Sequence, residues 1–377
     1  MKAIKWLVPC LAAVAGALSA GFAMRADAGT LPRQKSDRMW GVLIHLGMNM
    51  WADHKLEIKR GDPEDYTNPW RRCRQEILDH MGEQYCAAKK VRFDETLWRE
   101  ISEGYANAGV NAVILDLGEA VIYPSHPEIA VEGSWTPDKL KAELRRLRSL
   151  GFEVIPKLNF SAMHDAWLGV YERMISTPPY YKVCADLIGD VCEIFGRPKY
   201  FHVGMDEEVL SAPNANQFMA MRQGDLWWHD LNFYLGEIRR RGVTPMMWID
   251  HIVEKPELTK VYERLPKDVV LMPWYYESIF HYDVKWELRG MRELDKRGYI
   301  MCPCGSEVFF HDDNVELLVD WCEKRYDTKR IPGYFSAPWL EMAPWAKERL
   351  VKAGESIGRV RRRYDRYFRQ TTGVNDR

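Results

Sequence analysis

Three carboxylic acids stand side by side directly after a short apolar segment near the middle of the chain. Residues 202–205 are His-Val-Gly-Met, and Asp206, Glu207 and Glu208 follow at once. Neighbouring carboxyl groups repel one another when ionised, so one of them keeps its proton to a higher pH than an isolated acid does. A protonated acid beside an ionised one suits general acid–base chemistry. The sequence therefore predicts Asp206 and Glu207 as catalytic residues.

Polar and aromatic side chains follow several other apolar segments in the same way. Carboxylates and amides can bind hydroxyl groups, and flat rings can stack on the apolar faces of sugars. The predicted substrate-binding residues are Asn159, His164, Trp248, Asp250, Trp274, Tyr276, Glu307, Trp339 and Glu341. Each has a structural alternative, because a carboxylate can also cap a loop and a tryptophan can belong to the core.

Strands and helices that alternate along the chain must position these residues. Segments typical of strands are Gly41–Met48, Asn111–Leu117, Phe152–Phe160, Lys199–Met205, Thr244–Ile249, Val269–Trp274, Tyr299–Pro303 and Gly333–Pro338. Predicted helices are Asp94–Ala108, Pro137–Leu150, Tyr180–Phe195, Leu226–Arg241, Val284–Arg297, Asn314–Lys324 and Pro344–Tyr367, with a short one near Pro256–Arg264. No glycine-rich phosphate-binding turn follows the first strand, so the pattern predicts a single-domain α/β (β/α)₈ TIM barrel rather than an open sheet. Chemistry in such a barrel lies at the C-terminal ends of the strands, where the candidates stand.

The composition supports a globular domain and argues against several classes of partner. The chain is 46% hydrophobic and 28% charged, which is enough apolar material for a large core. A formal net charge of −1 offers no basic surface for nucleic acid. The histidines are scattered, so neither a metal site nor another cofactor is expected. The 15 tryptophans favour a carbohydrate partner.

Four segments resemble motifs of the β-N-acetylhexosaminidases of glycoside hydrolase family 20. Residues 202–207 resemble that family's His-x-Gly-Gly-Asp-Glu signature, and residues 154–159, followed by His164, resemble its Pro-Glu-Ile-Asp segment on strand three. Residues 248–250 resemble its Trp-x-Asp, and residues 339–341 resemble its closing Trp-x-Glu. The segments occur in the family's order and on the expected strands, which indicates a relative of that family.

The resemblance implies an enzyme that removes terminal β-linked N-acetylhexosamine by a retaining, substrate-assisted mechanism. The 2-acetamido oxygen of the substrate is then the nucleophile. Glu207 is implied as the general acid and base, and Asp206 as the residue that orients the acetamido group.

Several departures from the family pattern indicate a divergent relative. Met205 stands where the family has glycine, and the first strand offers His45 rather than an arginine. Residues 304–307 stand where the family has a tyrosine, with Tyr275 or Tyr276 as candidate substitutes. These differences bear on the identity of the substrate and leave the predicted barrel and the general acid unchanged.

Two alternatives stay open at the level of sequence. A retaining glycosidase with two carboxylates would use Glu207 as acid and base and Glu307 as nucleophile. A non-catalytic glycan-binding barrel would keep the site without turnover. Substrates with and without a 2-acetamido group separate the three hypotheses.

The N-terminal residues indicate export. Lys2 and Lys5 precede an apolar run over residues 6–23, and residues 26–28 are Ala-Asp-Ala. This order is typical of a signal peptide, so we expect residues 1–28 to be removed and residues 29–377 to form the barrel in a secreted or periplasmic protein. No later segment is apolar enough to span a bilayer, so no membrane contact is expected after cleavage.

A charged segment of more than forty residues, Ala52–Phe93, interrupts the connection between the first strand and its helix. Such a connection emerges on the catalytic face of a barrel, so the segment is predicted to form a lid or to extend the cleft. The alternative is a surface segment that takes no part in binding. Cys73 and Cys86 lie in this segment and are the predicted disulfide of an oxidising compartment.

Overall fold

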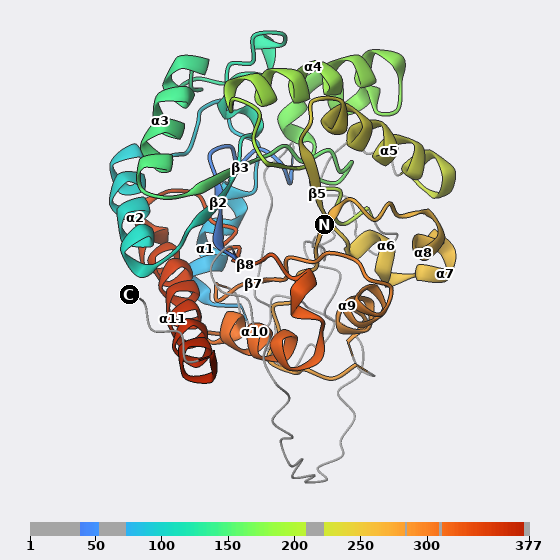
Figure 1. The fold of residues 1–377 in the computed structure, drawn as a ribbon. Helices are drawn as coiled ribbons and strands as arrows, with labels where there is room; N and C mark the ends of the chain where they lie inside the picture. Colours follow the sequence, from blue (N-terminus) through green and yellow to red (C-terminus); the bar gives the residue numbers. More distant parts are fainter. Residues whose placement is uncertain (1–37, 53–72, 209–221, 283–284, 309–310, 373–377) are drawn as a thin grey trace.

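Eight parallel strands form a nearly closed barrel surrounded by helices in the computed structural model of the protein (Figure 1). The structure describes residues 38–52, 73–208, 222–282, 285–308 and 311–372. The strands are β1 (Met39–His45), β2 (Ala112–Asp116), β3 (Glu153–Lys157), β4 (Tyr200–His202), β5 (Thr244–Trp248), β6 (Val270–Met272), β7 (Cys304–Gly305) and β8 (Gly333–Ser336). The predicted (β/α)₈ architecture is confirmed.

The helices alternate with the strands in sequence, and most of them cover the outside of the barrel (Figure 1). They are α1 (Gln75–Gln84), α2 (Glu95–Ala108), α3 (Pro137–Ser149), α4 (Pro178–Ile194), α5 (Gly224–Arg240), α6 (Asp250–Glu254), α7 (Pro256–Thr259), α8 (Val261–Arg264), α9 (Trp286–Lys296), α10 (Asn314–Arg325) and α11 (Lys347–Thr372). Local signals set several boundaries. Asp94 accepts hydrogen bonds from the backbone at the start of α2, Thr136 does the same for α3, and Gly109 ends α2 in the left-handed conformation.

The sheet closes between its two edge strands, β6 and β7. The strand order is β6-β5-β4-β3-β2-β1-β8-β7. Isolated bridges join Leu271 to Met301 and Trp274 to Cys304, and these bring the edges together. The predicted seventh strand, Tyr299–Pro303, is wrong in its bounds, because Pro303 has no N–H to donate and the regular ladder begins only at Cys304.

A row of charged and imidazole side chains crosses the C-terminal ends of the first four strands. The register pairs His45 with Asp116, Asp116 with Lys157, and Lys157 with His202. All four residues are buried. The Lys157 ammonium donates to Asp116 Oδ2, and His45 Nδ1 lies 3.3 Å from the same oxygen. Burial opposes ionisation of Asp116, but Lys157 and His45 outweigh it and lower the Asp116 pKa.

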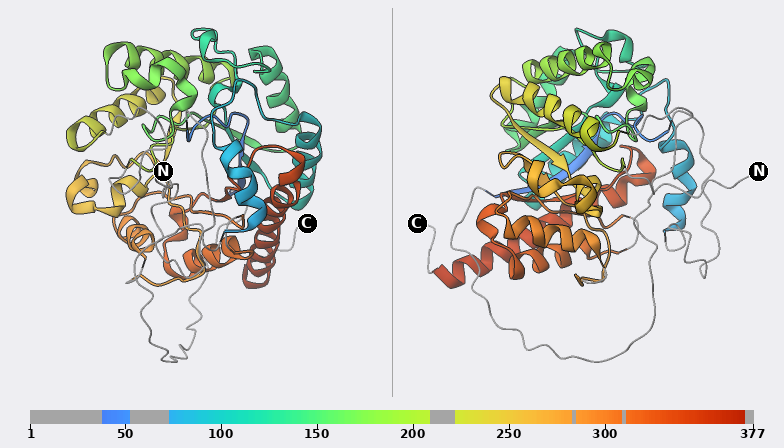
Figure 2. Two further views of the ribbon diagram at one scale, coloured as in Figure 1. Left: turned by 180° about the vertical axis from the view of Figure 1, so that it is seen from behind. Right: turned by 90° about the vertical axis from the view of Figure 1, so that its right-hand side faces the viewer.

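The described part of the insertion, residues 73–93, contains a helix that the sequence analysis did not predict. Helix α1 lies at one end of the barrel, apart from the ring of helices, in the side view of Figure 2. Tyr85 Oη donates to the carbonyl of Trp339 after β8, which attaches this segment to the barrel. Cys73 is buried and Cys86 is partly buried, and their disulfide stays a prediction.

The predicted signal peptide, residues 1–28, lies outside the described residues, as does the insertion over residues 53–72. Within the described ranges, no helix is both long and apolar enough to cross a membrane.

Candidate active site

The backbone that follows β4 is bent into an uncommon conformation at the predicted catalytic residues. Gly204, Met205 and Glu207 have φ values of 70°, 72° and 60°, in the left-handed region that non-glycine residues seldom adopt. A Cβ at position 204 would lie 1.9 Å from Asn159 Oδ1, so only glycine fits there. Backbone strain of this kind clusters at functional sites.

Asn159 holds Asp206 in a single orientation. Its Oδ1 accepts the backbone N–H groups of Ser161 at 3.0 Å and Met205 at 3.2 Å. The amide nitrogen therefore faces the other way and donates to Asp206 Oδ1 at 2.8 Å. Ser161 Oγ donates to the Asp206 backbone carbonyl at 2.5 Å. Side chains that follow β3 thus fix both the backbone and the carboxylate of Asp206.

His164 lies between the two predicted catalytic carboxylates. Its Nε2 is 3.0 Å from Glu207 Oε2 and 3.4 Å from Asp206 Oδ2. Burial opposes a charge on this imidazole, but the two carboxylates outweigh it and raise the His164 pKa to about 9. The ring is therefore protonated at neutral pH and donates toward the carboxylates. Its Nδ1 is buried, with no hydrogen-bond partner among the described residues.

Asp250 supports Glu207 from the side of β5. Its Oδ2 accepts the backbone N–H of Glu207 at 2.7 Å, and its Oδ1 accepts Trp274 Nε1 at 3.1 Å. Both oxygens therefore have protein partners. Burial, together with the nearby charges of Asp206 and Glu207, raises the Asp250 pKa well above its usual range.

Aromatic rings from four strand ends form a continuous wall at the site. The Trp339 ring centroid is 5.7 Å from that of Trp248 and 6.2 Å from that of Trp51, which sequence analysis left out of the predicted site residues. Trp339 Nε1 donates to Tyr276 Oη at 3.0 Å, and Tyr276 stacks on Trp274 with centroids 5.1 Å apart. Trp248 is fully buried, whereas Trp274 and Trp339 each remain 9% exposed.

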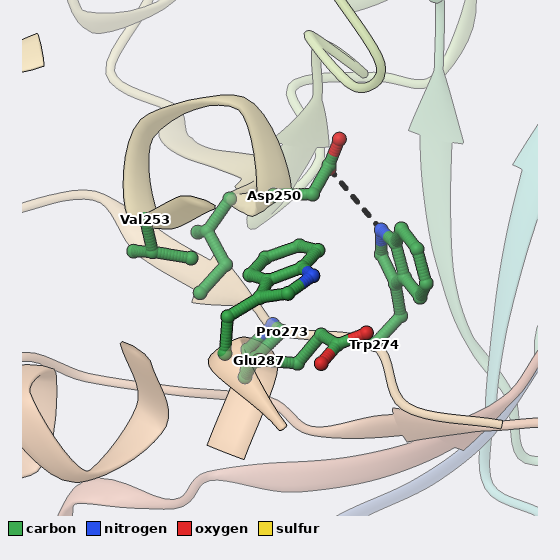
Figure 3. A pocket seen from close by; sticks show the side chains of 7 residues that line it. Asp250, Val253, Pro273, Trp274 and Glu287 are labelled. Carbon is green, nitrogen blue, oxygen red and sulfur yellow. Dashed lines mark hydrogen bonds between the residues drawn. The ribbon is translucent and has the colours of Figure 1, made fainter. Parts of the chain in front are cut away.

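A small pocket lies beside Asp250, between β6 and the helices α6 and α9 (Figure 3). Its volume is about 10 Å³, which is room for one water and far too little for a sugar. Glu287 lines it, and burial raises the pKa of that carboxyl to about 7. This pocket is therefore part of the packing behind Asp250.

The structure does not bring Glu307 to the Asp206–Glu207 pair. Glu307 Oε2 accepts from Ser336 Oγ at 3.3 Å, and the same carboxyl hydrogen-bonds to Ser356 and interacts with the charge of Arg359, both on α11. Burial raises its pKa to about 7. A Cβ at Gly305 would meet Asn314 and Val315 of α10, and Glu307, two residues further along, faces the same helical layer.

Glu341 is placed at the rim of the site, in contact with the insertion. Its Oε1 accepts Trp345 Nε1 at 2.7 Å, and its Oε2 lies 3.5 Å from Arg92 Nε. The guanidinium of Arg92 also donates to the carbonyls of Glu83 and Gln84 at the end of α1. Glu341 thus joins the loop after β8 to the insertion.

His45 at the end of β1 and Glu119 shortly after β2 have structural contacts. His45 belongs to the buried row with Asp116, and Glu119 accepts the backbone N–H groups of Met48 and Asn49 at 3.0 and 3.1 Å. Sequence analysis missed Ser161, whose type and position carry no signal until β3 and β4 are placed together. In the described part of the chain, no group of three or more His, Cys, Asp or Glu side chains is arranged to hold a metal ion.

The fold is similar to solved structures of glycoside hydrolase family 20 enzymes. The β-N-acetylhexosaminidase of Streptomyces coelicolor A3(2) matches with a TM-score of 0.54 and 12% identity, over 90% of this chain and 70% of that one. The N-acetyl-β-hexosaminidase of Streptomyces plicatus matches with a TM-score of 0.53 and 13% identity, over 85% and 63%. The exo-β-N-acetylglucosaminidase of Vibrio harveyi, solved with N-acetylglucosamine, matches with a TM-score of 0.50 and 16% identity, over 77% of this chain.

The present chain covers 57% of the length of the Vibrio harveyi structure, so the similarity concerns part of that protein. No family model matches the sequence, and a search of curated proteins gives no match. The resemblance inferred from the four motifs is confirmed as a structural similarity over most of the chain. The chain has the barrel fold of these family 20 structures.

The raised pKa of His164 predicts a pH-dependent contribution to stability. A pKa that rises from about 6.5 in the unfolded chain to about 9 in the folded one stabilises the fold fully below pH 6.5. That contribution is lost as the pH rises through 9, and it amounts to about 3 kcal/mol. Urea unfolding of the parent and of His164→Gln between pH 6 and 10 should show their difference shrinking by this amount.

His251→Gln is the matched control for this measurement. Burial lowers the pKa of His251, so its contribution changes below pH 6.5 and stays flat between pH 7.5 and 9. A parent-to-His164→Gln difference that stays constant up to pH 10 would contradict the ion pair of His164 with Asp206 and Glu207.

Proposed function

We propose that this protein is a glycoside hydrolase that removes terminal β-linked N-acetylhexosamine by a retaining, substrate-assisted mechanism. One observation carries the proposal. Asp206 and Glu207 leave the same strand end, share His164 at 3.4 and 3.0 Å, and stand beside a wall of tryptophan rings. The similar Vibrio harveyi enzyme was solved in complex with N-acetylglucosamine, and this supports an amino sugar as the ligand here.

Glu207 is the proposed proton donor to the leaving group. Its side chain is partly exposed, whereas Asp206 is 6% exposed, so Glu207 is the acid that an incoming glycosidic oxygen meets first. His164 Nε2 lies 3.0 Å from Glu207 Oε2, which leaves Oε1 to carry the proton that is donated to the leaving group. After the leaving group departs, the same carboxylate takes a proton from water, which attacks the intermediate.

Asp206 is the proposed partner of the acetamido group. Asn159 donates to its Oδ1, and its Oδ2 lies on the side of His164. An ionised carboxylate held in this way can orient the acetamide N–H and stabilise the positive charge that develops as the acetamide oxygen attacks the anomeric carbon. The fixed orientation matters because reorganisation during the reaction would reduce that stabilisation.

The two-carboxylate alternative needs a nucleophile opposite Glu207, and the contacts of Glu307 with β8 and α11 argue against that role. The acetamide oxygen then supplies the nucleophile. This difference makes the substrate panel decisive.

A panel of aryl glycosides tests the proposed reaction. We expect release of the aryl group from the N-acetylglucosaminide or the N-acetylgalactosaminide, and none from the matching glucoside and galactoside, because only the first pair carries the nucleophile. A thiazoline analogue of the bicyclic intermediate should inhibit. Equal turnover of the glucoside would contradict substrate assistance, and no release from any substrate while the sugar still binds would indicate a non-catalytic glycan-binding barrel.

Variants of the three carboxylates test the assigned roles. Asp206→Asn should lower kcat by about a hundredfold or more, because the developing charge loses its counter-ion. Glu207→Gln should slow substrates with poor leaving groups most, since activated aryl glycosides need little protonation. Glu307→Gln is the matched control, a buried carboxyl that should keep kcat within about threefold. Rescue of Glu307→Gly by azide, with indifference to the thiazoline, would instead favour the two-carboxylate mechanism.

We further propose that the protein is exported after cleavage behind Ala28. The basic Lys2 and Lys5, the apolar run over residues 6–23 and the Ala-Asp-Ala at residues 26–28 support this. N-terminal sequencing of the protein recovered from the periplasm or medium of a bacterial host should begin at or near Gly29. Intact Met1 on protein retained in the cytoplasm would argue against export.

A further inference from the structure

Behind the Asp206–Glu207 pair lies a buried arginine that the proposed reaction does not use. Arg222 is 1% exposed, and it pairs with Glu208, the third acid of the triplet after β4. Its Nε donates to Glu208 Oε2 at 3.1 Å, and its Nη2 donates to Glu208 Oε1. Its Nη1 donates to Asp230 Oδ2 at 3.1 Å and to Tyr234 Oη at 2.8 Å, both on α5. This bidentate pairing of the guanidinium with the Glu208 carboxylate fixes Glu208 in one orientation.

The same ion pair holds the segment that leads to His164. Arg222 Nη2 donates to the Phe160 carbonyl at 2.6 Å, and Glu208 Oε1 accepts the backbone N–H of Ala162 at 2.8 Å. Ser161, between them, donates to the Asp206 backbone. The pair therefore bonds to the exits of β3 and β4 at once.

Glu207 needs support on both sides because its backbone is in the left-handed region. On one side Asp250 accepts its N–H at 2.7 Å. On the other side the next residue, Glu208, is anchored to Arg222. Without the arginine, the buried carboxylates of Glu208 and Asp230 would lose the cation they share, and Glu208 would have to move or take up a proton.

We infer that Arg222 is a positioning residue, which acts through Glu208 to hold Glu207 against His164 and never touches the substrate. The kinetic consequence rests on the proposed function. The geometric consequence, the distance between Glu207 and His164, does not.

The kinetic test compares Arg222→Met with Arg38→Met on the preferred aryl glycoside. A displacement of Glu207 by about 1 Å should lower kcat by about a hundredfold, with KM changed by less than about threefold. Arg222→Lys keeps a cation and should recover part of kcat. Arg38 forms a largely buried pair with Glu323 just before β1, so Arg38→Met should cost comparable thermal stability and keep kcat within about twofold.

Two kinetic outcomes would overturn the inference. One is a folded Arg222→Met enzyme with the kcat of the parent. The other is a loss of kcat in Arg38→Met in proportion to its loss of stability, because the effect at Arg222 would then be a general one. If Arg222→Met fails to fold, Glu208→Gln serves in its place, since it keeps the size of the side chain and removes the charge that Arg222 binds.

The geometric test needs no turnover. The His164 imidazole is assigned by its absence in the NMR spectrum of His164→Gln. In the parent it should titrate at about 9, because Asp206 and Glu207 face it and outweigh burial and the more distant Lys157. In Arg222→Met or Glu208→Gln the His164 pKa should fall toward 6.5 as Glu207 withdraws. An unchanged titration in a folded variant would falsify the positioning role. If the parent cleaves no glycoside but the His164 pKa still falls in the variant, the positioning role is upheld and the proposed function alone is refuted.

Discussion

The strained backbone after β4 is the constraint on which the site depends. Met205 and Glu207 adopt left-handed conformations that cost roughly 1–2 kcal/mol each for residues with a Cβ. Such a turn persists only where its surroundings determine it, and here hydrogen bonds reach it from three directions. Asn159 binds it from β3, Asp250 from β5, and the Glu208–Arg222 pair ties it to α5. The positions of the Asp206 and Glu207 carboxylates therefore depend on how these elements pack together.

The register of β1 to β4 brings together a group of buried charged residues that the family motif does not imply. Lys157 occupies the position of the motif's glutamate, and Asp116 on the neighbouring strand supplies its counter-charge. Burial, and then Lys157, lower the pKa of His202 well below its usual range. Burial also lowers the His45 pKa, although Asp116 opposes it. Both imidazoles thus stay neutral around one buried ion pair, while His164, closer to the acids, is charged.

The described part of the insertion after β1 supports the site through its contacts with the residues that follow β8. Tyr85 bonds to the Trp339 backbone, and Arg92 caps α1 and pairs with Glu341. The aromatic wall therefore depends on the insertion, which the sequence shows only as a charged segment. Trp339 itself has a φ of 54°, so its ring is held at the site against the ordinary backbone preference.

The sequence by itself determined the barrel and the position of the acids, because apolar periodicity and helix caps are local signals and each strand ends near where its pattern ends. Tertiary structure alone decided which acids share a site. Glu207 and Asp250 meet across β4 and β5, whereas Glu307 lies on the face of its segment that packs against the helices and contacts β8 and α11. The pairing of Glu208 with Arg222 likewise has no local signature. A buried ion pair has no sequence spacing of its own, and only the packing that excludes water selects the partner.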